Sequence, residues 1–149
     1  MSQKFYEMEI VNKNVTFLTN CEVYQLLKPL AKTNINNSTN KLEQQSKTKD
    51  SNLPTIVYES LRYLEKTPCV DQSPQLIEDF LKKLDEKKNE FNLTKIEKLQ
   101  LINQKPTNAV ELQYIIEDSE ERFTLEQMDD LLEFTITNLS SESNKTEVN

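Results

Sequence analysis

The most constraining feature of this sequence is the complete absence of glycine from its 149 residues. Glycine adopts left-handed backbone conformations most readily, and phosphate-binding loops and dinucleotide-binding motifs depend on it. Its absence excludes those motifs, together with the turn that carries the nucleophile of α/β-hydrolases. The remaining chain breaks are five prolines and short polar runs, which favours helices that end at prolines and polar turns.

Histidine is also absent, which removes the most common general base and the most common zinc ligand. The two cysteines are too few for a disulfide framework and are expected to be free thiols in a reducing compartment. We therefore assign no catalytic, cofactor-binding or metal-ligating residue, and we do not expect an enzyme. The formal net charge of −7 repels phosphate groups and suits a basic partner better than nucleic acid.

The first helix signal covers residues 20–31. Thr19 and Glu22 form a capping box at its start. Four apolar residues follow on one helical face, namely Val23, Leu26, Leu27 and Leu30. A single amphipathic helix of this length is marginal in water, so it needs a surface on its own domain or on a partner.

Residues 53–139 predict a compact domain of five helices, which we expect to build its core without the first helix. The expected helix starts are prolines or capping side chains: Pro54, Ser73, Thr94, Thr107 or Asn108, and Thr124. The predicted inward-facing residues are Ile56, Val57, Leu61, Leu64, Leu76, Ile77, Phe80, Leu81, Leu84, Ile96, Leu99, Ile102, Val110, Ile115, Ile116, Leu125, Met128, Leu131, Leu132 and Ile136.

The two helical parts are separated by residues 33–52, which are mostly Asn, Ser, Thr, Lys and Gln. Such a segment cannot bury much surface, and it predicts a flexible linker, more plausibly an insertion without a role than a functional element. We therefore expect a partner-binding segment over residues 1–32, a linker over 33–52, a helical domain over 53–139 and a disordered tail over 140–149.

Both cysteines are interpreted as structural residues. Cys69 lies between Pro68 and Val70 at the joint of two predicted helices, with no histidine to activate it and only Lys66 as a basic neighbour. A small buried residue in an inter-helix turn is the favoured interpretation. Cys21, in the first turn of its helix, is a slightly better thiolate candidate and is still expected to be inert.

The most acidic stretch comprises Glu117, Asp118, Glu120 and Glu121. Its spacing and its lack of glycine do not fit a calcium-binding loop. Two interpretations stay open, a docking patch for a basic partner and an ordinary solvated face. Lysines between residues 82 and 105 offer a possible phosphate contact, but acidic neighbours dilute them and helix C-termini favour lysine anyway.

Long ordered runs resemble the small stalk subunit of RNA polymerase III, a family also known as the calcitonin-gene-related-peptide receptor component protein. The resemblance covers residues 20–132 apart from the linker. It is carried by NCEVYQLLKPL, by YESLRYLEKTPCVDQSPQLIEDFL and by LTKIEKLQLINQKPTNAVELQYIIEDSEERFTLEQMDDLL. It is most specific in KTP and QSP at residues 66–68 and 72–74, in residues 93–101 and in residues 117–122.

The resemblance implies an all-α fold with a partner-binding N-terminal segment and a helical domain of the HRDC kind. It implies a nuclear, non-catalytic subunit that pairs with a larger OB-fold stalk subunit, protrudes from the polymerase core and docks initiation factors. The partner would supply most of the RNA contact. The expected partner interface is Val23, Leu26, Leu27, Leu30, Tyr58 and Leu61, and the expected factor-docking patch is Glu117, Asp118, Glu120 and Glu121.

Two rival functions come from other classes. One is a membrane-associated receptor signalling adaptor, the role in the second family name; the sequence shows no basic amphipathic helix and no lipidation signal to support it. The other is an autonomous nucleic-acid-binding helical domain, which the net charge opposes. Purification of the chain with its partners distinguishes the three functions.

Overall fold

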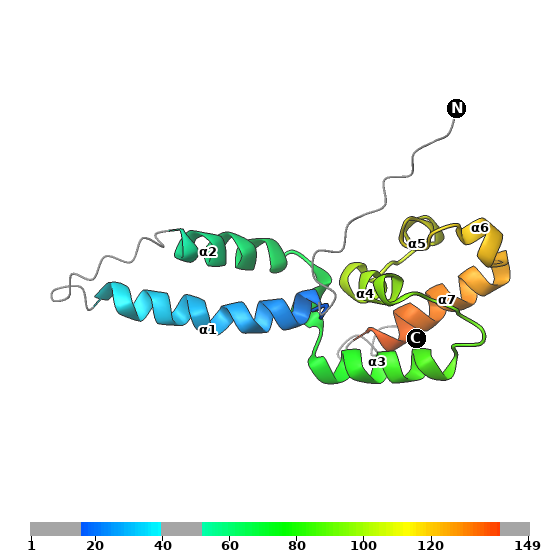
Figure 1. The fold of residues 1–149 in the computed structure, drawn as a ribbon, viewed down its shortest axis with the longest axis horizontal. Helices are drawn as coiled ribbons and strands as arrows, with labels where there is room; N and C mark the ends of the chain where they lie inside the picture. The colour runs from blue at the N-terminus through cyan, green and yellow to red at the C-terminus, as the bar shows by residue number, and fades with distance from the viewer. Residues whose placement is uncertain (1–15, 40–51, 141–149) are drawn as a thin grey trace, which may run out of the picture.

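The computed structural model describes residues 16–39 and 52–140, and every regular element in these residues is helical, as the sequence predicts (Figure 1). The α-helices are α1 (Asn20–Thr39), α2 (Leu53–Leu64), α3 (Pro74–Glu86), α4 (Lys95–Gln104), α5 (Ala109–Ile115), α6 (Ser119–Arg122) and α7 (Leu125–Asn138). A short 3₁₀ helix, η1 (Pro68–Asp71), joins α2 to α3.

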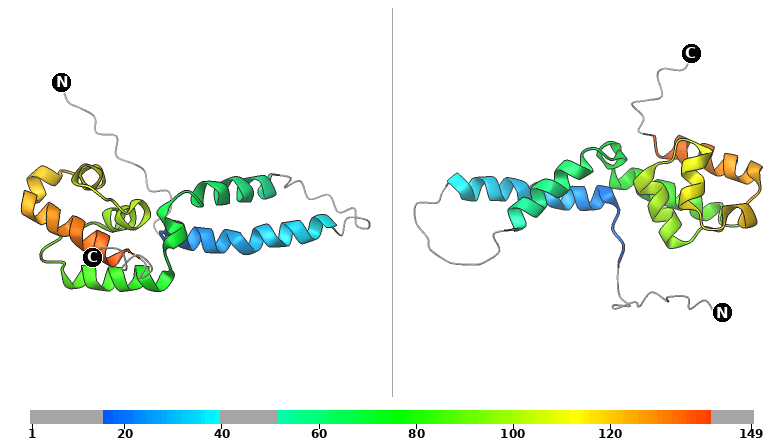
Figure 2. Two further views of the ribbon diagram at one scale, coloured as in Figure 1. Left: turned by 180° about the vertical axis from the view of Figure 1, so that it is seen from behind. Right: turned by 90° about the horizontal axis from the view of Figure 1, so that it is seen from above.

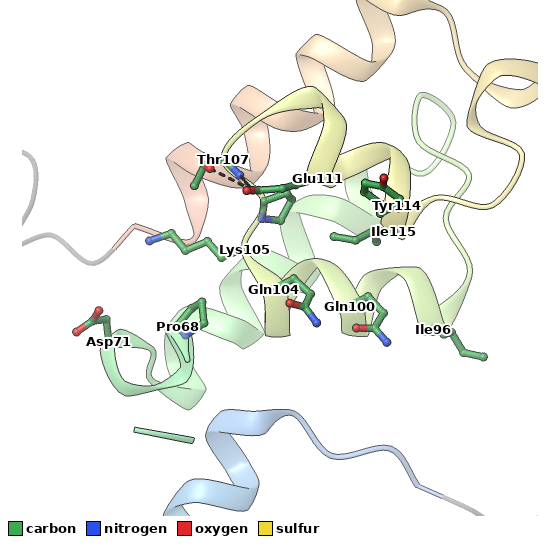
Figure 3. A pocket seen from close by; sticks show the side chains of 11 residues that line it. Pro68, Asp71, Ile96, Gln100, Gln104, Lys105, Thr107, Glu111, Tyr114 and Ile115 are labelled. Atoms are coloured by element: carbon green, nitrogen blue, oxygen red, sulfur yellow. Dashed lines mark hydrogen bonds between the residues drawn. The ribbon is translucent and has the colours of Figure 1, made fainter. Parts of the chain in front are cut away.

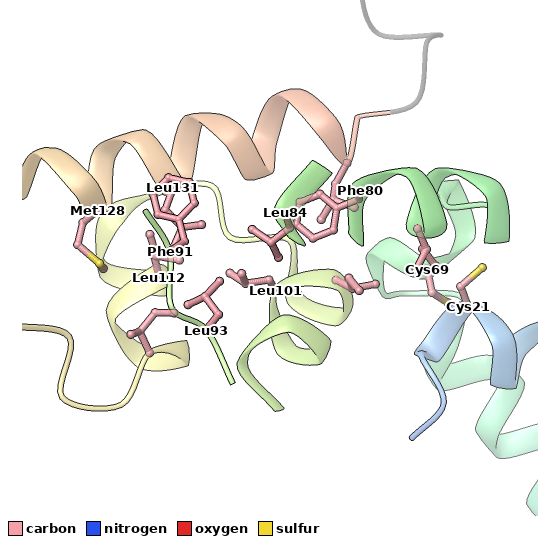
Figure 4. Packing of buried hydrophobic residues seen from close by; sticks show 14 of the residues in the cluster. Cys21, Cys69, Phe80, Leu84, Phe91, Leu93, Leu101, Leu112, Met128 and Leu131 are labelled. Atoms are coloured by element: carbon pink, nitrogen blue, oxygen red, sulfur yellow. The ribbon is translucent and has the colours of Figure 1, made fainter. Parts of the chain in front are cut away.

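The molecule has two visible parts. Helices α1 and α2 lie side by side and project from one end as a hairpin, whereas α3 to α7 pack together at the other end (Figures 1 and 2). One apolar cluster runs through the packed end and reaches the base of the hairpin (Figure 4). Its members include Cys21, Cys69, Phe80, Leu84, Phe91, Leu93, Leu101, Leu112, Met128 and Leu131.

Helix starts follow the predicted capping residues. The side-chain oxygens of Ser73 and Asn108 each accept a hydrogen bond from the backbone N–H three residues on, and Thr94 and Thr124 form complete capping boxes. Helix ends do without glycine, because Lys105 adopts a left-handed conformation with φ of 46° at the end of α4. That conformation normally favours glycine, so this turn carries a backbone cost.

Helix α1 differs from its prediction in length and in packing. It continues through Pro29 to Thr39, so residues 33–39, expected to belong to the linker, are helical. The expectation that the core forms without this helix is wrong, because Cys21 and Tyr24 belong to the apolar cluster. The backbone N–H of Asn20 also donates to Asn103 Oδ1 over 2.8 Å. The rest of the expected linker, residues 40–51, and residues 141–149 of the expected tail lie outside the described residues.

The five predicted helices correspond to α2, α3, α4, α5 and α7, and η1 and α6 were not expected. Several predicted core residues are exposed, namely Ile56, Ile96, Val110, Leu125 and Ile136. Three of these, Ile96, Val110 and Leu125, stand in the first turn of their helices, where the backbone only begins to approach the core. Leu101 of α4 and Leu112 of α5, which were not among the predicted core residues, are fully buried.

Candidate docking surfaces

The hairpin of α1 and α2 exposes more apolar surface than its own packing needs. Along α1, Leu26 is 60% exposed and Leu30 is also exposed, one helical turn further on. On α2, Ile56 and Tyr63 are exposed seven residues apart and therefore share one face of that helix. Isolated apolar residues on a surface need no explanation, but paired rows on adjacent helices indicate an interaction site.

A shallow hollow of about 410 Å³ lies between the helices beside Tyr63. Val23 lines the hollow from α1, and Glu59, Ser60, Tyr63 and Leu64 line it from α2. Since Val23, Leu26 and Leu30 follow one another at helical spacing, the hollow joins their row to that of Ile56 and Tyr63. We name this surface, made of Val23, Leu26, Leu30, Ile56 and Tyr63, the hairpin flank.

The structure divides the six residues that the sequence assigns to the partner interface. Leu26 and Leu30 are exposed on the hairpin flank, whereas Val23, Leu27 and Leu61 are half-buried against the apolar cluster. Val23 still lines the hollow at the base of the flank. Tyr58 is exposed, but it follows Ile56 by two residues, or about 200° around α2, and so lies on the other side of that helix. Ile56 was missed as an interface residue because it was predicted to face the core, and Tyr63 was assigned neither to the core nor to the interface.

An ion pair between buried Glu97 and partly exposed Arg122 holds the acidic stretch in place. Arg122 Nη1 lies 2.5 Å from Glu97 Oε1, and the same guanidinium donates to the carbonyl oxygens of Glu117 and Asn92, each over 2.8 Å. Burial alone would raise the pKa of Glu97, but hydrogen bonds from Arg122 and from Thr94 outweigh it and lower this pKa to about 2. Glu97 is therefore a carboxylate at neutral pH.

The acidic patch, meaning Glu117, Asp118, Glu120 and Glu121, is exposed around α6. Among the described residues, none of its four carboxylates forms an ion pair. The sequence between residues 111 and 133 contains one basic residue, Arg122, and that residue is engaged by Glu97. The patch consequently keeps its negative charge at the surface.

A groove of about 970 Å³ lies between η1, α4 and α5 (Figure 3). Its floor includes Ile96, Gln100 and Gln104, which follow one another on one face of α4. Tyr114 and Ile115 of α5 line one end, and Pro68, Asp71 and Lys105 line the other. On the α5 wall, Thr107 donates to the Glu111 carboxylate from its backbone N–H and its hydroxyl, over 2.8 and 3.1 Å.

The lysines between residues 82 and 105 are less available than their number suggests. Three of them form ion pairs with acidic neighbours, Lys82 with Glu78, Lys87 with Glu90 and Lys98 with Asp85. Lys83 donates to Asn138 Oδ1 over 2.8 Å. The prediction that this face makes little or no contact with nucleic acid has no direct test, and the pairing is in line with it.

Both cysteines are buried at the joint between the hairpin and the packed end (Figure 4). The Cys69 thiol donates to the carbonyl oxygen of Leu64 and the Cys21 thiol to that of Gln72, each over 3.4 Å. Burial, and next the neighbouring Cys69, raise the pKa of Cys21, so the Cys21 thiol is not activated. The prediction that Cys69 is a small buried residue in an inter-helix turn is confirmed.

Two further searches of the described residues are negative. They contain no group of three or more Cys, Asp and Glu side chains that could hold a metal ion. Within the same residues, no helix is both long and apolar enough to cross a membrane.

Comparison with known proteins identifies the family. A model of the RNA polymerase Rpb4 family matches residues 17–139, which include the hairpin, the acidic patch and the groove. The DNA-directed RNA polymerase III subunit rpc9 of Schizosaccharomyces pombe is 33% identical over 136 residues, and the alignment covers 85% of this chain and 95% of that relative. This chain therefore belongs to the RNA polymerase Rpb4 family.

Proposed function

We propose that this chain is a non-catalytic stalk subunit of RNA polymerase III, which pairs with a larger OB-fold stalk subunit in the nucleus and supports promoter-directed initiation. Family membership supports an accessory subunit of an RNA polymerase. The similarity to a relative named as a polymerase III subunit supports the assignment to that polymerase. The domain of the HRDC kind and the initiation role come from the sequence resemblance.

The observation that carries the proposed pairing is the hairpin flank. A projecting hairpin with exposed leucines on one helix and exposed Ile56 and Tyr63 on the other presents an apolar surface away from the packed end. Burying such a surface on a second protein is favourable, because apolar area removed from water contributes about 25 cal/mol per Å². The exposed apolar surface of the hairpin is also the ground on which we propose a partner-binding segment, residues 1–32, and a helical domain, residues 53–139.

The pairing is tested by changing the two exposed leucines, Leu26→Asp with Leu30→Asp. Completing the burial of two half-exposed leucines is worth about 2 kcal/mol, and a carboxylate forced into an apolar interface adds several more. A loss of several kcal/mol weakens binding by at least about a hundredfold. We expect the variant to lose the larger stalk subunit in a pull-down from co-expressing cells, while its thermal melting stays unchanged.

A matched control is Leu125→Asp, because Leu125 is 82% exposed on α7 and lies outside the hairpin flank. It should pair as the wild type does. Pairing that survives the double change would show that the anchor lies elsewhere. Failure of the wild-type chain to pair at all would contradict the stalk function itself.

The acidic patch is the second proposed docking surface, for basic segments of initiation factors. Its support is the set of four exposed carboxylates without ion pairs among the described residues. The receptor-adaptor alternative is not favoured by the comparisons, which connect the chain to RNA polymerase.

A further inference from the structure

The floor of the groove between α4 and α5 is suited to an extended polypeptide. The side chains of Gln100 and Gln104 are exposed and form no hydrogen bond with any residue that the structure describes. Four residues apart on a helix, they are separated by about 6 Å along its axis. An extended chain repeats its orientation every two residues, or about 6.6 Å. The two amides can therefore donate to, and accept from, alternate peptide groups of one segment.

Apolar side chains stand at one end of this floor. Tyr114 is 89% exposed, Ile96 is exposed opposite it, and Ile115 is half-buried between them (Figure 3). An isolated tyrosine so exposed gains nothing from the fold, whereas tyrosine is enriched at protein interfaces and often dominates their binding energy. This end of the groove can hold one or two apolar side chains of a bound segment.

The acidic patch begins at the same end. The backbone N–H of Glu117 donates to Glu97 Oε1 over 3.3 Å, and Glu97 is the residue after Ile96. The first residue of the patch is thereby fixed beside the start of α4. Arg122 forms its ion pair with Glu97, and within the described residues none of the four patch carboxylates forms an ion pair. Along its length, the groove thus presents the amides of Gln100 and Gln104, then the apolar side chains of Ile96 and Tyr114, and then the negative charge of the acidic patch.

We propose that this groove binds an extended basic segment of a partner protein, with apolar residues over Gln100, Ile96 and Tyr114 and with Lys or Arg residues over the acidic patch. The inference rests on the proposed function in taking this partner to be an initiation factor. From Ile96 to Gln104 the floor is about 12 Å long, which accommodates about four extended residues. Two or three basic residues beyond them reach the patch.

The first experiment selects ligands without assuming a sequence. A library of random twelve-residue peptides displayed on phage is selected on the immobilised full-length chain. We expect enrichment of alternating apolar residues next to a Lys- or Arg-rich run. Enrichment of acidic peptides, or of none above background, overturns the proposal.

The second experiment locates the site with labelled versions of the enriched peptides and fluorescence anisotropy. Gln100→Ala with Tyr114→Ala, both exposed positions, should weaken binding by about tenfold or more. Tyr63→Ala removes an exposed tyrosine from the hairpin flank and should leave the affinity unchanged. Equal losses from the two variants would show that the peptide does not sit in the groove.

Charge is tested separately by Glu120→Gln with Glu121→Gln, against Asp129→Asn with Asp130→Asn on α7. Only the first pair should weaken binding, by about threefold or more at low salt, and reduce its salt dependence. Equal effects would indicate unspecific attraction and overturn the site.

Other occupants give different results. If the chain self-associates, or binds an RNA oligonucleotide, and the Gln100→Ala, Tyr114→Ala variant abolishes that binding, the groove is occupied by a second copy or by RNA. Either result would overturn the proposal of a basic partner segment. The groove variant should still pair with the larger stalk subunit. If the groove tests fail while the chain still pairs with the larger stalk subunit, only this inference is refuted. If the wild-type chain does not pair with that subunit, the proposed function is refuted.

Discussion

Replacing Glu97 with glutamine removes one charge from the ion pair that holds α4 to the acidic stretch. Glutamine keeps the shape of the side chain and can still accept the hydrogen bond that Glu97 receives from the backbone N–H of Thr94. What it loses is the attraction to Arg122, whose Nη1 and Nη2 lie 2.5 and 3.2 Å from the two carboxylate oxygens. It also loses one of two acceptor oxygens, since Oε1 accepts from the backbone N–H of Glu117 over 3.3 Å, so the pH dependence is what isolates the electrostatic contribution.

The size of the effect follows from the pKa of Glu97. Its ordinary value of 4.5 is lowered to about 2 in the fold; the side chain of Glu97 is only 6% exposed, whereas that of Arg122 is 29% exposed, so solvent partly screens the pair. A difference of this size contributes about 3 kcal/mol to the free energy of unfolding at neutral pH. Because Arg122 is partly open to solvent, this value lies at the lower end of the cost of breaking a fully buried ion pair on one side, about 3–5 kcal/mol.

The sign of the pH dependence is fixed by the direction of the shift. A carboxyl whose pKa is lowered by folding stabilises the fold above its unfolded pKa, and this stabilisation is lost as pH falls from about 4.5 towards 2. The stability difference between the wild type and Glu97→Gln should fall from about 3 kcal/mol at pH 7 to about 1 kcal/mol at pH 3. Other carboxyls titrate in both proteins and cancel.

Urea unfolding followed by far-UV circular dichroism at both pH values measures this difference. The matched control is Glu111→Gln, since Glu111 also accepts from a backbone N–H and a hydroxyl of Thr107 but is exposed and has no cation against it. Its free energy of unfolding should stay close to that of the wild type. A large loss in Glu97→Gln that does not change with pH would refute the electrostatic argument and assign the residue a packing role.

Two smaller predictions concern packing and backbone. Leu101→Ala should lower the free energy of unfolding, measured in urea, by about 2–5 kcal/mol, because Leu101 is fully buried. Ile96→Ala should leave this free energy nearly unchanged, because Ile96 is exposed. Similar losses from the two substitutions would contradict the side of α4 that the structure turns towards the core. Lys105→Gly should raise the same free energy by about 0.5–1 kcal/mol, since its φ of 46° suits glycine, and a lower value would show that the left-handed turn carries no strain.

Much of the fold could be predicted because its signals are local. A capping threonine and a Glu or Gln three residues later identify a helix start wherever they occur, and the starts of α4 and α7 both follow this pattern. The absence of glycine, together with helical spacing of apolar residues, was sufficient for the all-α class. Such signals depend on a few neighbouring residues and are little affected by the rest of the chain.

The side of a helix that faces the core is harder to predict, because it depends on which neighbouring helix it contacts. In the predicted stripe of α4, Ile102 is buried and Leu99 half-buried, but Ile96 is exposed, and Leu101, which the stripe left out, has no exposed surface. Interactions between residues far apart in the sequence could not be predicted for the same reason. The partner of Arg122 lies 25 residues away, and the sequence showed only one arginine in an acidic run. The groove also required the placement of η1 beside α4 and α5.

The hairpin, which we propose as the docking element, is tied to the core at one end. Its base is fixed, since Cys21 and Tyr24 enter the apolar cluster and Asn20 donates to Asn103. Beyond that base, α1 and α2 project from the packed end, side by side, with exposed Leu26 and Leu30. An element held at one end transmits its orientation to whatever it binds. The buried thiols are therefore best understood as the anchor of the hairpin, at the joint where its direction is set.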